Sequence, residues 1–251
     1  MPLQQEISTK EFTVRFSDCD HTSHLRLSSI FRFMEESAVL DSEQNGFGIW
    51  KMVQHGYTYA ISRIKLRVNH IPVWGEQLTI STWTKGFFNH KVALKDYSIF
   101  DAQGNAVAQA TSSWLLVNLK TGKAEDPENA PYLPLIFPEH QAISENLELL
   151  DVEGTPQLVL AKCARYSDLD MNRHVNNCRY VDWAMDALSL QEIKEHPIRS
   201  IQMNYLSQVP FDGNVNIIRF PNTNYHAYVF GVNANDPTQV HFQTRIGFAK
   251  T

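Results

Sequence analysis

Three polar side chains at alternate positions, Asp170, Asn172 and His174, are the residues of this sequence best suited to chemistry. A histidine beside a carboxylate and an amide can activate water, polarise a carbonyl group and stabilise the oxyanion that forms on it. In an extended segment, side chains at alternate positions project to the same side of the chain. The spacing therefore predicts a hydrolytic site that acts on a carbonyl group.

The residues that follow the three side chains are expected to begin a helix. The first N–H groups of a helix have no partner within it, and the helix dipole favours negative charge there. The N–H groups of Val175, Asn176 and Asn177 are therefore candidate donors to an oxyanion. A structural explanation fits the same spacing equally well, because Asn172 and His174 would then cap the helix and form turn hydrogen bonds.

A related segment occurs earlier in the chain. The ten residues from Arg15 to His24 precede those from Arg165 to His174 by 150 positions, and five of the ten are identical. An apolar stripe with helical spacing follows each copy. The two stripes are Ile30, Phe33, Met34, Ser37 and Ala38, and Tyr180, Trp183, Ala184, Ala187 and Leu188. The chain is therefore predicted to contain one structural unit twice.

Runs typical of β-strands follow each predicted helix. In the first half they cover residues 64–68, 78–83, 92–100 and 108–117, and in the second half 198–206, 215–220, 225–232 and 240–248. A Pro/Gly turn precedes strands in both halves, at residues 71–76 and 209–214. Each half is predicted to be one long helix followed by an antiparallel meander, an α+β arrangement.

The two halves are predicted to be domains of residues 1–125 and 158–251, joined by a connector of residues 126–157. Prolines exclude a long helix from this connector. They are Pro127, Pro131, Pro134, Pro138 and Pro156. Apolar clusters between the prolines predict that the connector packs along the protein surface.

The composition narrows the class of protein. A net charge of −5 argues against a nucleic-acid binder. Cys19, Cys163 and Cys178 have no metal-binding spacing and form no disulfide framework. There is no apolar run of about 18 residues and no leader pattern in residues 1–6, so we expect a cytoplasmic protein that neither spans nor binds a membrane.

The polar motif and its surroundings resemble the acyl-ACP thioesterases, the plant and bacterial enzymes that release fatty acids from acyl carrier protein. Two segments carry the resemblance. They are residues 168–177 with Tyr180 and Trp183, and residues 63–69 with Pro72, Trp74, Gly75 and Glu76. The resemblance spans nearly the whole chain. It implies two tandem hotdog units, each a long helix wrapped by a curved antiparallel sheet, with the reaction centre in the C-terminal unit.

The resemblance also implies site residues. Asp170, Asn172 and His174 match the family's catalytic set. Where many plant members carry Glu followed by Cys, this chain has Gln208 and Val209. A glutamine amide does not ionise near neutral pH. Gln208 would therefore position the water while His174 or Asp170 accepts the proton, or the activity would be weak. The N-terminal half would hold the acyl chain.

The resemblance requires no metal and no organic cofactor. The implied partner is acyl carrier protein with a fatty acyl-phosphopantetheine group. A cluster in the first copy nevertheless has two interpretations, a metal site or a degenerate catalytic loop. The cluster consists of Asp18, Asp20, His21 and His24. A metal site requires a full ligand set in fixed geometry, whereas a degenerate loop explains why Thr22 replaces Asn172, so we prefer the latter.

Two surfaces are open to functional or structural interpretation. Arg63, Lys65 and Arg67 alternate along one predicted strand, and they either meet the acidic carrier protein or form a solvated edge. The solvated edge is the simpler interpretation. Large apolar residues either line an acyl-chain tunnel or belong to ordinary core. They are Phe31, Phe33, Met34, Trp50, Trp74, Trp83 and Trp114.

Three functions compete. The first is hydrolysis of fatty acyl-ACP to free fatty acid, a step of lipid metabolism. The second, acyl-CoA hydrolysis, shares the chemistry and differs only in the carrier. The third is a non-catalytic acyl-binding protein; such regulators usually add a helix-turn-helix, for which the residues before Phe12 are too few. A monomer and a homodimer are both expected to be workable, because a tandem copy supplies the usual hotdog pair internally.

Overall fold

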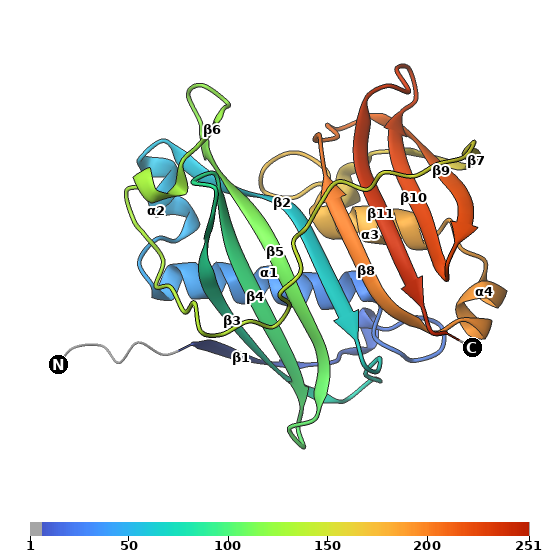
Figure 1. Ribbon diagram of the computed structural model, residues 1–251, viewed down its shortest axis with the longest axis horizontal. Helices are drawn as coiled ribbons and strands as arrows, with labels where there is room; N and C mark the ends of the chain where they lie inside the picture. The colour runs from blue at the N-terminus through green and yellow to red at the C-terminus, as the bar shows by residue number, and fades with distance from the viewer. Residues whose placement is uncertain (1–6, 251) are drawn as a thin grey trace. The chain divides into compact units, whose positions relative to one another are not determined.

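The computed structural model describes residues 7–250, shown in Figure 1. The chain divides into two compact units, Met1–Leu147 and Glu148–Thr251. Residues 1–6, in which we expected no leader, lie outside the described part. Within residues 7–250, no helix is both long enough and apolar enough to cross a membrane.

Unit 1 contains a long helix and an antiparallel sheet. The helical elements are η1 (Phe16–Asp18), α1 (Leu27–Gln44), α2 (Ile49–Gln54) and η2 (Pro127–Asn129). The strands are β1 (Ser8–Thr13), β2 (Tyr57–Val68), β3 (Gln77–Phe88), β4 (Val92–Asp101), β5 (Ala106–Asn118) and β6 (Ala124–Glu125). Within this unit the strand order is β1-β3-β4-β5-β2, and β6 pairs with β5.

Unit 2 repeats this plan. Its helical elements are η3 (Tyr166–Asp168), α3 (Asn177–Met185) and α4 (Leu190–Glu195). Its strands are β7 (Gln157–Cys163), β8 (Ile198–Tyr205), β9 (Asn214–Thr223), β10 (His226–Asn233) and β11 (Val240–Phe248). Their order is β7-β9-β10-β11-β8, which is the order of unit 1 strand for strand. The predicted α+β class and the tandem hotdog arrangement are confirmed.

The helix in each unit buries the predicted apolar stripe. On α1, Ile30 and Met34 are each 1% exposed, and Phe33 stacks on Phe12 of β1 with ring centroids 4.8 Å apart. On α3, the buried Tyr180 packs against Phe242 of β11, with ring centroids 5.1 Å apart. Burial of each large apolar side chain contributes about 1.5–3 kcal/mol, so these contacts hold helix and sheet together.

Helix α3 has 9 residues, compared with 18 in α1. Ala187 and Leu188, which continue the predicted stripe, lie beyond its end but are still buried. A tight turn, in which the Leu188 N–H donates to the Met185 carbonyl at 3.0 Å, keeps both side chains on the same face. The helical spacing of the apolar residues therefore predicted correctly which side chains are buried, but it predicted too long a helix. Ser189 then starts α4 with a capping box.

The two Pro/Gly turns occupy equivalent places, but their prolines do not align. The Gly75 N–H donates to the Val14 carbonyl, and the Asp212 N–H donates to the Ala164 carbonyl, each at 2.9 Å. Both residues have positive φ, 89° at Gly75 and 60° at Asp212. Gly75 therefore corresponds to Asp212, and the expected proline-to-proline pairing is wrong by one residue.

The part of the connector that belongs to unit 1 packs along the sheet of that unit, in line with the predicted packing along the surface. The indole N–H of Trp83 on β3 donates to the His140 carbonyl at 2.8 Å, and Lys85 donates to the Ile143 carbonyl at 2.7 Å. The Ile143 side chain is 1% exposed. Hydrogen bonds and an apolar anchor therefore fix this segment in place, even though it has little regular structure.

The connector also covers the basic residues of β2. Glu145 forms ion pairs with both Lys65 and Arg67, and Arg63 donates to the Leu147 carbonyl at 2.5 Å. Lys65 is only 9% exposed. It is neither a solvated edge residue nor a charge presented to a partner, so both interpretations of this position are wrong.

The candidate tunnel residues fall into two groups. Trp50 and Trp74 are 66% and 61% exposed, so neither lines an enclosed tunnel within unit 1. Trp83 is buried, and the half-buried Trp114 donates its indole N–H to the Ser112 hydroxyl at 2.8 Å. Trp50 and Trp74 therefore belong neither to the core nor to an enclosed tunnel within unit 1, and the role of the buried members stays a prediction.

Candidate active site

The predicted motif forms a tight loop between η3 and α3 rather than an extended segment. Leu169 and Val175 form an antiparallel bridge. Between them the Asp170 N–H donates to the His174 carbonyl at 3.0 Å, and the Arg173 N–H donates to the Asp170 carbonyl at 3.1 Å. Arg173 has a φ of 66°, which closes the turn. The chain reverses here, so Asp170 and His174 face each other across the loop.

The three predicted side chains cluster on this loop. Asp170 Oδ1 lies 3.9 Å from His174 Nδ1 and accepts the Asn172 N–H at 2.8 Å. The Asn172 amide nitrogen lies 3.5 Å from Asp170 Oδ2. The Asp170 and His174 side chains are 14% and 17% exposed, and Asn172 is exposed. A carboxylate, an amide and an imidazole thus share one partly sheltered place.

The surroundings of His174 determine which of its ring nitrogens carries the proton. Nδ1 lies 3.2 Å from the Val175 carbonyl oxygen and 3.9 Å from the Asp170 carboxylate, and both groups are acceptors. A neutral imidazole has one donor and one acceptor nitrogen. In the neutral ring these two acceptors favour the tautomer with the proton on Nδ1, in which Nε2 keeps a lone pair that can accept a proton from water.

The N-cap of α3 is neither of the two residues, Asn172 and His174, that were expected to cap the helix if the motif were purely structural. Asn176 is the N-cap of α3, and its side chain accepts the Cys178 N–H at 2.8 Å. Neither Asn172 nor His174 caps this helix, so the capping part of that explanation is wrong, although both residues form hydrogen bonds within the turn. Cys178 is buried in the first turn of α3.

The expected set of oxyanion donors is smaller than predicted. The Val175 N–H donates to the Val209 carbonyl at 2.9 Å, and the Asn176 N–H donates to the Asp168 carbonyl at 2.8 Å. Both N–H groups are therefore used in holding the loop. Asn177, the first residue of α3, is the remaining member of the predicted set.

Gln208 precedes the segment that lies along the loop. The next residue, Val209, donates its N–H to the Tyr180 hydroxyl oxygen at 3.1 Å, and Pro210 forms an antiparallel bridge with His174. Gln208 itself is exposed. Burial, with a smaller contribution from the Asp170 charge, raises the pKa of Tyr180. Tyr180 was predicted as part of the buried stripe and of the family motif; its hydroxyl also positions the backbone beside Gln208.

Two domain models of one family match this chain. The acyl-ACP thioesterase N-terminal domain matches residues 5–129, and the acyl-ACP thioesterase C-terminal domain matches residues 158–250. The chain belongs to the acyl-ACP thioesterase family. The resemblance seen in the motif residues is thereby confirmed.

Curated relatives of this acyl-ACP thioesterase family member include chloroplastic plant enzymes. The palmitoyl-acyl carrier protein thioesterase of Gossypium hirsutum is 21% identical over 79% of this chain and 51% of that protein. The oleoyl-acyl carrier protein thioesterase 2 of Arabidopsis thaliana is 25% identical over 81% of this chain and 60% of that protein. The chain spans about half the length of the first relatives that it matches.

Solved structures of the same family share the fold. An acyl-ACP thioesterase from Bacteroides thetaiotaomicron superposes with a TM-score of 0.86 at 21% identity, over 97% of this chain and 98% of that one. The 12:0-ACP thioesterase from Umbellularia californica superposes with a TM-score of 0.80 at 17% identity, over 97% of both chains. At these identities the likeness establishes the tandem fold.

The first copy of the loop in this acyl-ACP thioesterase family member has a different polar network. The Thr22 hydroxyl lies 2.7 Å from Asp20 Oδ1 and 2.9 Å from His24 Nδ1. Burial acts to raise the pKa of Asp20, but hydrogen bonds from Thr22 and His24 outweigh it and lower that pKa. His24 is exposed, whereas His174 is partly buried. The two copies share a backbone plan and differ in their side-chain chemistry.

The metal interpretation of the first copy is not supported. Among residues 7–250, only one group of His, Cys, Asp and Glu side chains is close enough together to hold an ion, and it consists of His90, Asp126 and Glu128. The Asp20 carboxylate instead accepts hydrogen bonds within its own loop.

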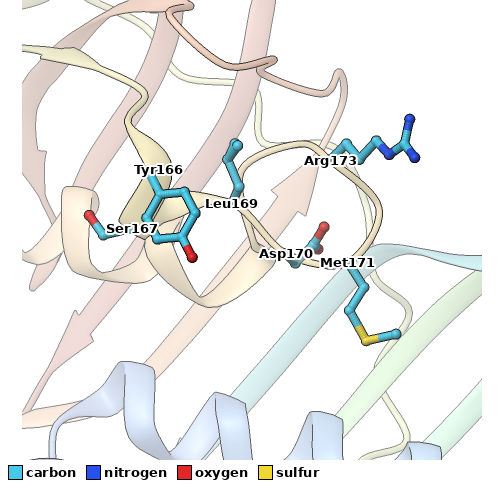
Figure 2. A pocket seen from close by; sticks show the side chains of 6 residues that line it. All are labelled: Tyr166, Ser167, Leu169, Asp170, Met171 and Arg173. Carbon is cyan, nitrogen blue, oxygen red and sulfur yellow. The ribbon is translucent and has the colours of Figure 1, made fainter.

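An open depression of about 630 Å³ borders the second loop (Figure 2). Its lining residues are Tyr166, Ser167, Leu169, Asp170, Met171 and Arg173. Of the four predicted site residues, the lining includes Asp170 alone. Tyr166 and Met171 are 88% and 74% exposed, and Figure 2 shows Arg173 extending away from the other labelled side chains. The depression flanks the loop and does not enclose His174.

Proposed function

We propose that this protein hydrolyses fatty acyl thioesters carried by acyl carrier protein and releases the free fatty acid. The observation that carries the proposal is the His174 ring, whose Nδ1 faces two acceptor oxygens and whose Nε2 is left as a base. This ring stands on the loop that matches the family motif. Family membership supports the thioester as the bond that is attacked.

The proposed reaction needs only groups of this loop and water. His174 Nε2 accepts a proton from water as the oxygen attacks the thioester carbonyl carbon. The Asn172 amide and the Asn177 N–H donate to the oxygen on which negative charge develops. Asp170 orients the ring and balances the imidazolium charge. The C–S bond then breaks, and His174 returns its proton to the thiolate, giving a fatty acid and a free thiol.

The division of labour between the halves is also a proposal. Residues 1–125 would hold the acyl chain, residues 126–157 would connect, and residues 158–251 would carry the reaction. The polar networks of the two loops support it, because Thr22 occupies the first copy where Asn172 stands in the second. An amide can donate to a carbonyl oxygen while its own oxygen accepts, whereas the Thr22 hydroxyl is engaged by Asp20 and His24.

The carrier can be tested with matched substrates. We expect the purified protein to release thiol from acyl-ACP with a kcat/KM at least about tenfold above that for the same acyl group on CoA, because a protein carrier adds contacts beyond the shared arm. Thiol release is followed over a panel of chain lengths. Equal values for both carriers would make acyl-CoA hydrolysis the function. Binding without release in either case would make the protein a non-catalytic acyl binder.

Gln208 offers a gain-of-function test. Gln208→Glu places a carboxylate beside the loop at an exposed position, where it ionises and can accept a proton from water. We expect kcat to rise roughly tenfold, less than the ~10²–10⁴-fold that a general base typically contributes, because His174 already serves as a base. Gln103→Glu, in the exposed β4–β5 turn, is the charge-matched control and should leave kcat unchanged. No change in Gln208→Glu would remove this position from the site.

A further inference from the structure

Asp168 is a buried acidic residue at the start of the candidate catalytic loop. Its Oδ1 lies 2.9 and 2.8 Å from Nε and Nη2 of Arg179, and its Oδ2 accepts the Arg165 N–H at 2.9 Å. Its carbonyl accepts the Asn176 N–H at 2.8 Å. One residue therefore links the chain before the loop, the chain after it and the first turn of α3.

The contact between Asp168 and Arg179 is sheltered and directional. The Asp168 side chain is 10% exposed and that of Arg179 is 37% exposed. Two guanidinium nitrogens meet one carboxylate oxygen, and a planar guanidinium with two contacts fixes orientation in a way that an ammonium group does not. Arg179 also contacts Asp182 one turn along α3, with Nη1 and Oδ2 at 3.0 Å.

The first copy of the loop provides an internal comparison. Asp18 keeps the two backbone hydrogen bonds of its counterpart Asp168. The residue 150 positions before Arg179 is Ser29, whose hydroxyl donates to the Asp18 carbonyl at 2.8 Å. The guanidinium paired with Asp18 belongs to Arg32, at 3.8 Å. The first copy, which has Thr22 in place of Asn172, therefore also has a longer arginine–aspartate contact than the second copy.

We propose that Arg179 is a positioning residue that acts through Asp168. By holding Asp168 against α3, it fixes both ends of residues 169–175 and so sets where the His174 ring stands relative to the start of the helix. The inference rests on the proposed function, in which this loop is catalytic. Small displacements of reacting groups can cost about a hundredfold in rate, so the contact is expected to govern kcat.

The kinetic test compares three single variants on acyl-ACP. Arg179→Met is expected to lower kcat roughly 10- to 100-fold while KM stays within about twofold. Arg179→Lys keeps the charge without the planar fork and is expected to recover only part of that loss. Asp182→Asn removes the other partner of Arg179 and leaves the Asp168 contact, so its kcat should match the wild type. A kcat for Arg179→Met equal to that of Asp182→Asn would overturn the inference.

A double variant separates positioning from the burial of an unpaired charge. Asp168→Asn/Arg179→Met removes both charges, and the asparagine oxygen can still accept the Arg165 N–H. Arg179→Met leaves the Asp168 carboxylate without its main partner, so we expect its temperature of thermal unfolding to fall. The double variant should regain the wild-type unfolding temperature but not the wild-type kcat. Recovery of both would show that Arg179 serves only to neutralise Asp168, and would refute the positioning role.

A second readout does not depend on turnover. The ¹⁵N shifts of the His174 ring report which nitrogen carries the proton. We expect a single Nδ1–H form in the wild type and in Asp182→Asn, and a mixture of tautomers in Arg179→Met. Unchanged ¹⁵N shifts in Arg179→Met would refute the positioning role, whether or not the wild type hydrolyses thioesters. A wild type that hydrolyses no thioester would refute the proposed function but not the positioning role.

Discussion

Replacement of His174 by alanine is expected to lower kcat for acyl-ACP by at least about a hundredfold, the loss typical of a missing general base. Nδ1 of the ring faces the Val175 carbonyl and the Asp170 carboxylate, and the tautomer that these acceptors favour leaves Nε2 to receive the proton of water. Alanine removes this acceptor without disturbing the bridge between the backbones of residues 174 and 210. KM should stay within about threefold, because the lost interaction belongs to the transition state.

The chain supplies a matched control for this experiment. His24 occupies the same place in the first copy of the loop, with the same backbone bridge pattern, but it is exposed and hydrogen-bonded to Thr22. His24→Ala should therefore retain wild-type kcat. Equal losses in His24→Ala and His174→Ala would mean that both loops act or that neither ring is the base. Near-normal turnover in His174→Ala would remove this residue from the mechanism.

Much of the fold could be predicted because burial leaves a periodic signal. Eight strands lie where period-two and β-rich runs placed them, and both helix stripes are buried. Three strands were missed, the two-residue β6, β1 and β7. Strands β1 and β7 are each an end strand of the order within their own unit, where they pair on one side only, and β1 alternates half-buried with exposed residues. End strands need fewer apolar residues, so their sequences carry a weaker signal.

For the candidate site, the sequence indicated residues but not how they are arranged. Sequence indicated Asp170, Asn172 and His174, but not that a turn closed at Arg173 brings the outer two together. It also could not show that the Asp168 carbonyl accepts a hydrogen bond from the Asn176 N–H, one of the expected oxyanion donors. Such partners are separated by several residues and meet through the path of the backbone, which no residue pattern records. The same limit applies to Glu145, whose pairing with β2 spans about eighty positions.

An ion pair buried between α1 and β4 of unit 1 gives the second large prediction. Lys95 on β4 pairs with Asp41 on α1, and their side chains are 9% and 8% exposed. Burial lowers the pKa of Lys95 more than the neighbouring Asp41 raises it. Lys95→Met would leave Asp41 with the Asn45 amide at 2.8 Å but without a countercharge. We expect the free energy of unfolding to fall by about 3–5 kcal/mol, as for other buried pairs that lose one member.

Urea unfolding followed by tryptophan fluorescence measures this change, because four of the five tryptophans lie in unit 1, namely Trp50, Trp74, Trp83 and Trp114. Glu128→Gln, which breaks the exposed pair with His90, is the control and should change the free energy by less than about 1 kcal/mol.

The double variant Asp41→Leu/Lys95→Met decides what the pair contributes. Removing both charges also removes their desolvation cost, so the double variant should be at least as stable as the wild type. A double variant as unstable as Lys95→Met would show instead that the pair stabilises unit 1 directly. In the expected case, stability gives no reason to keep two charges between α1 and the sheet.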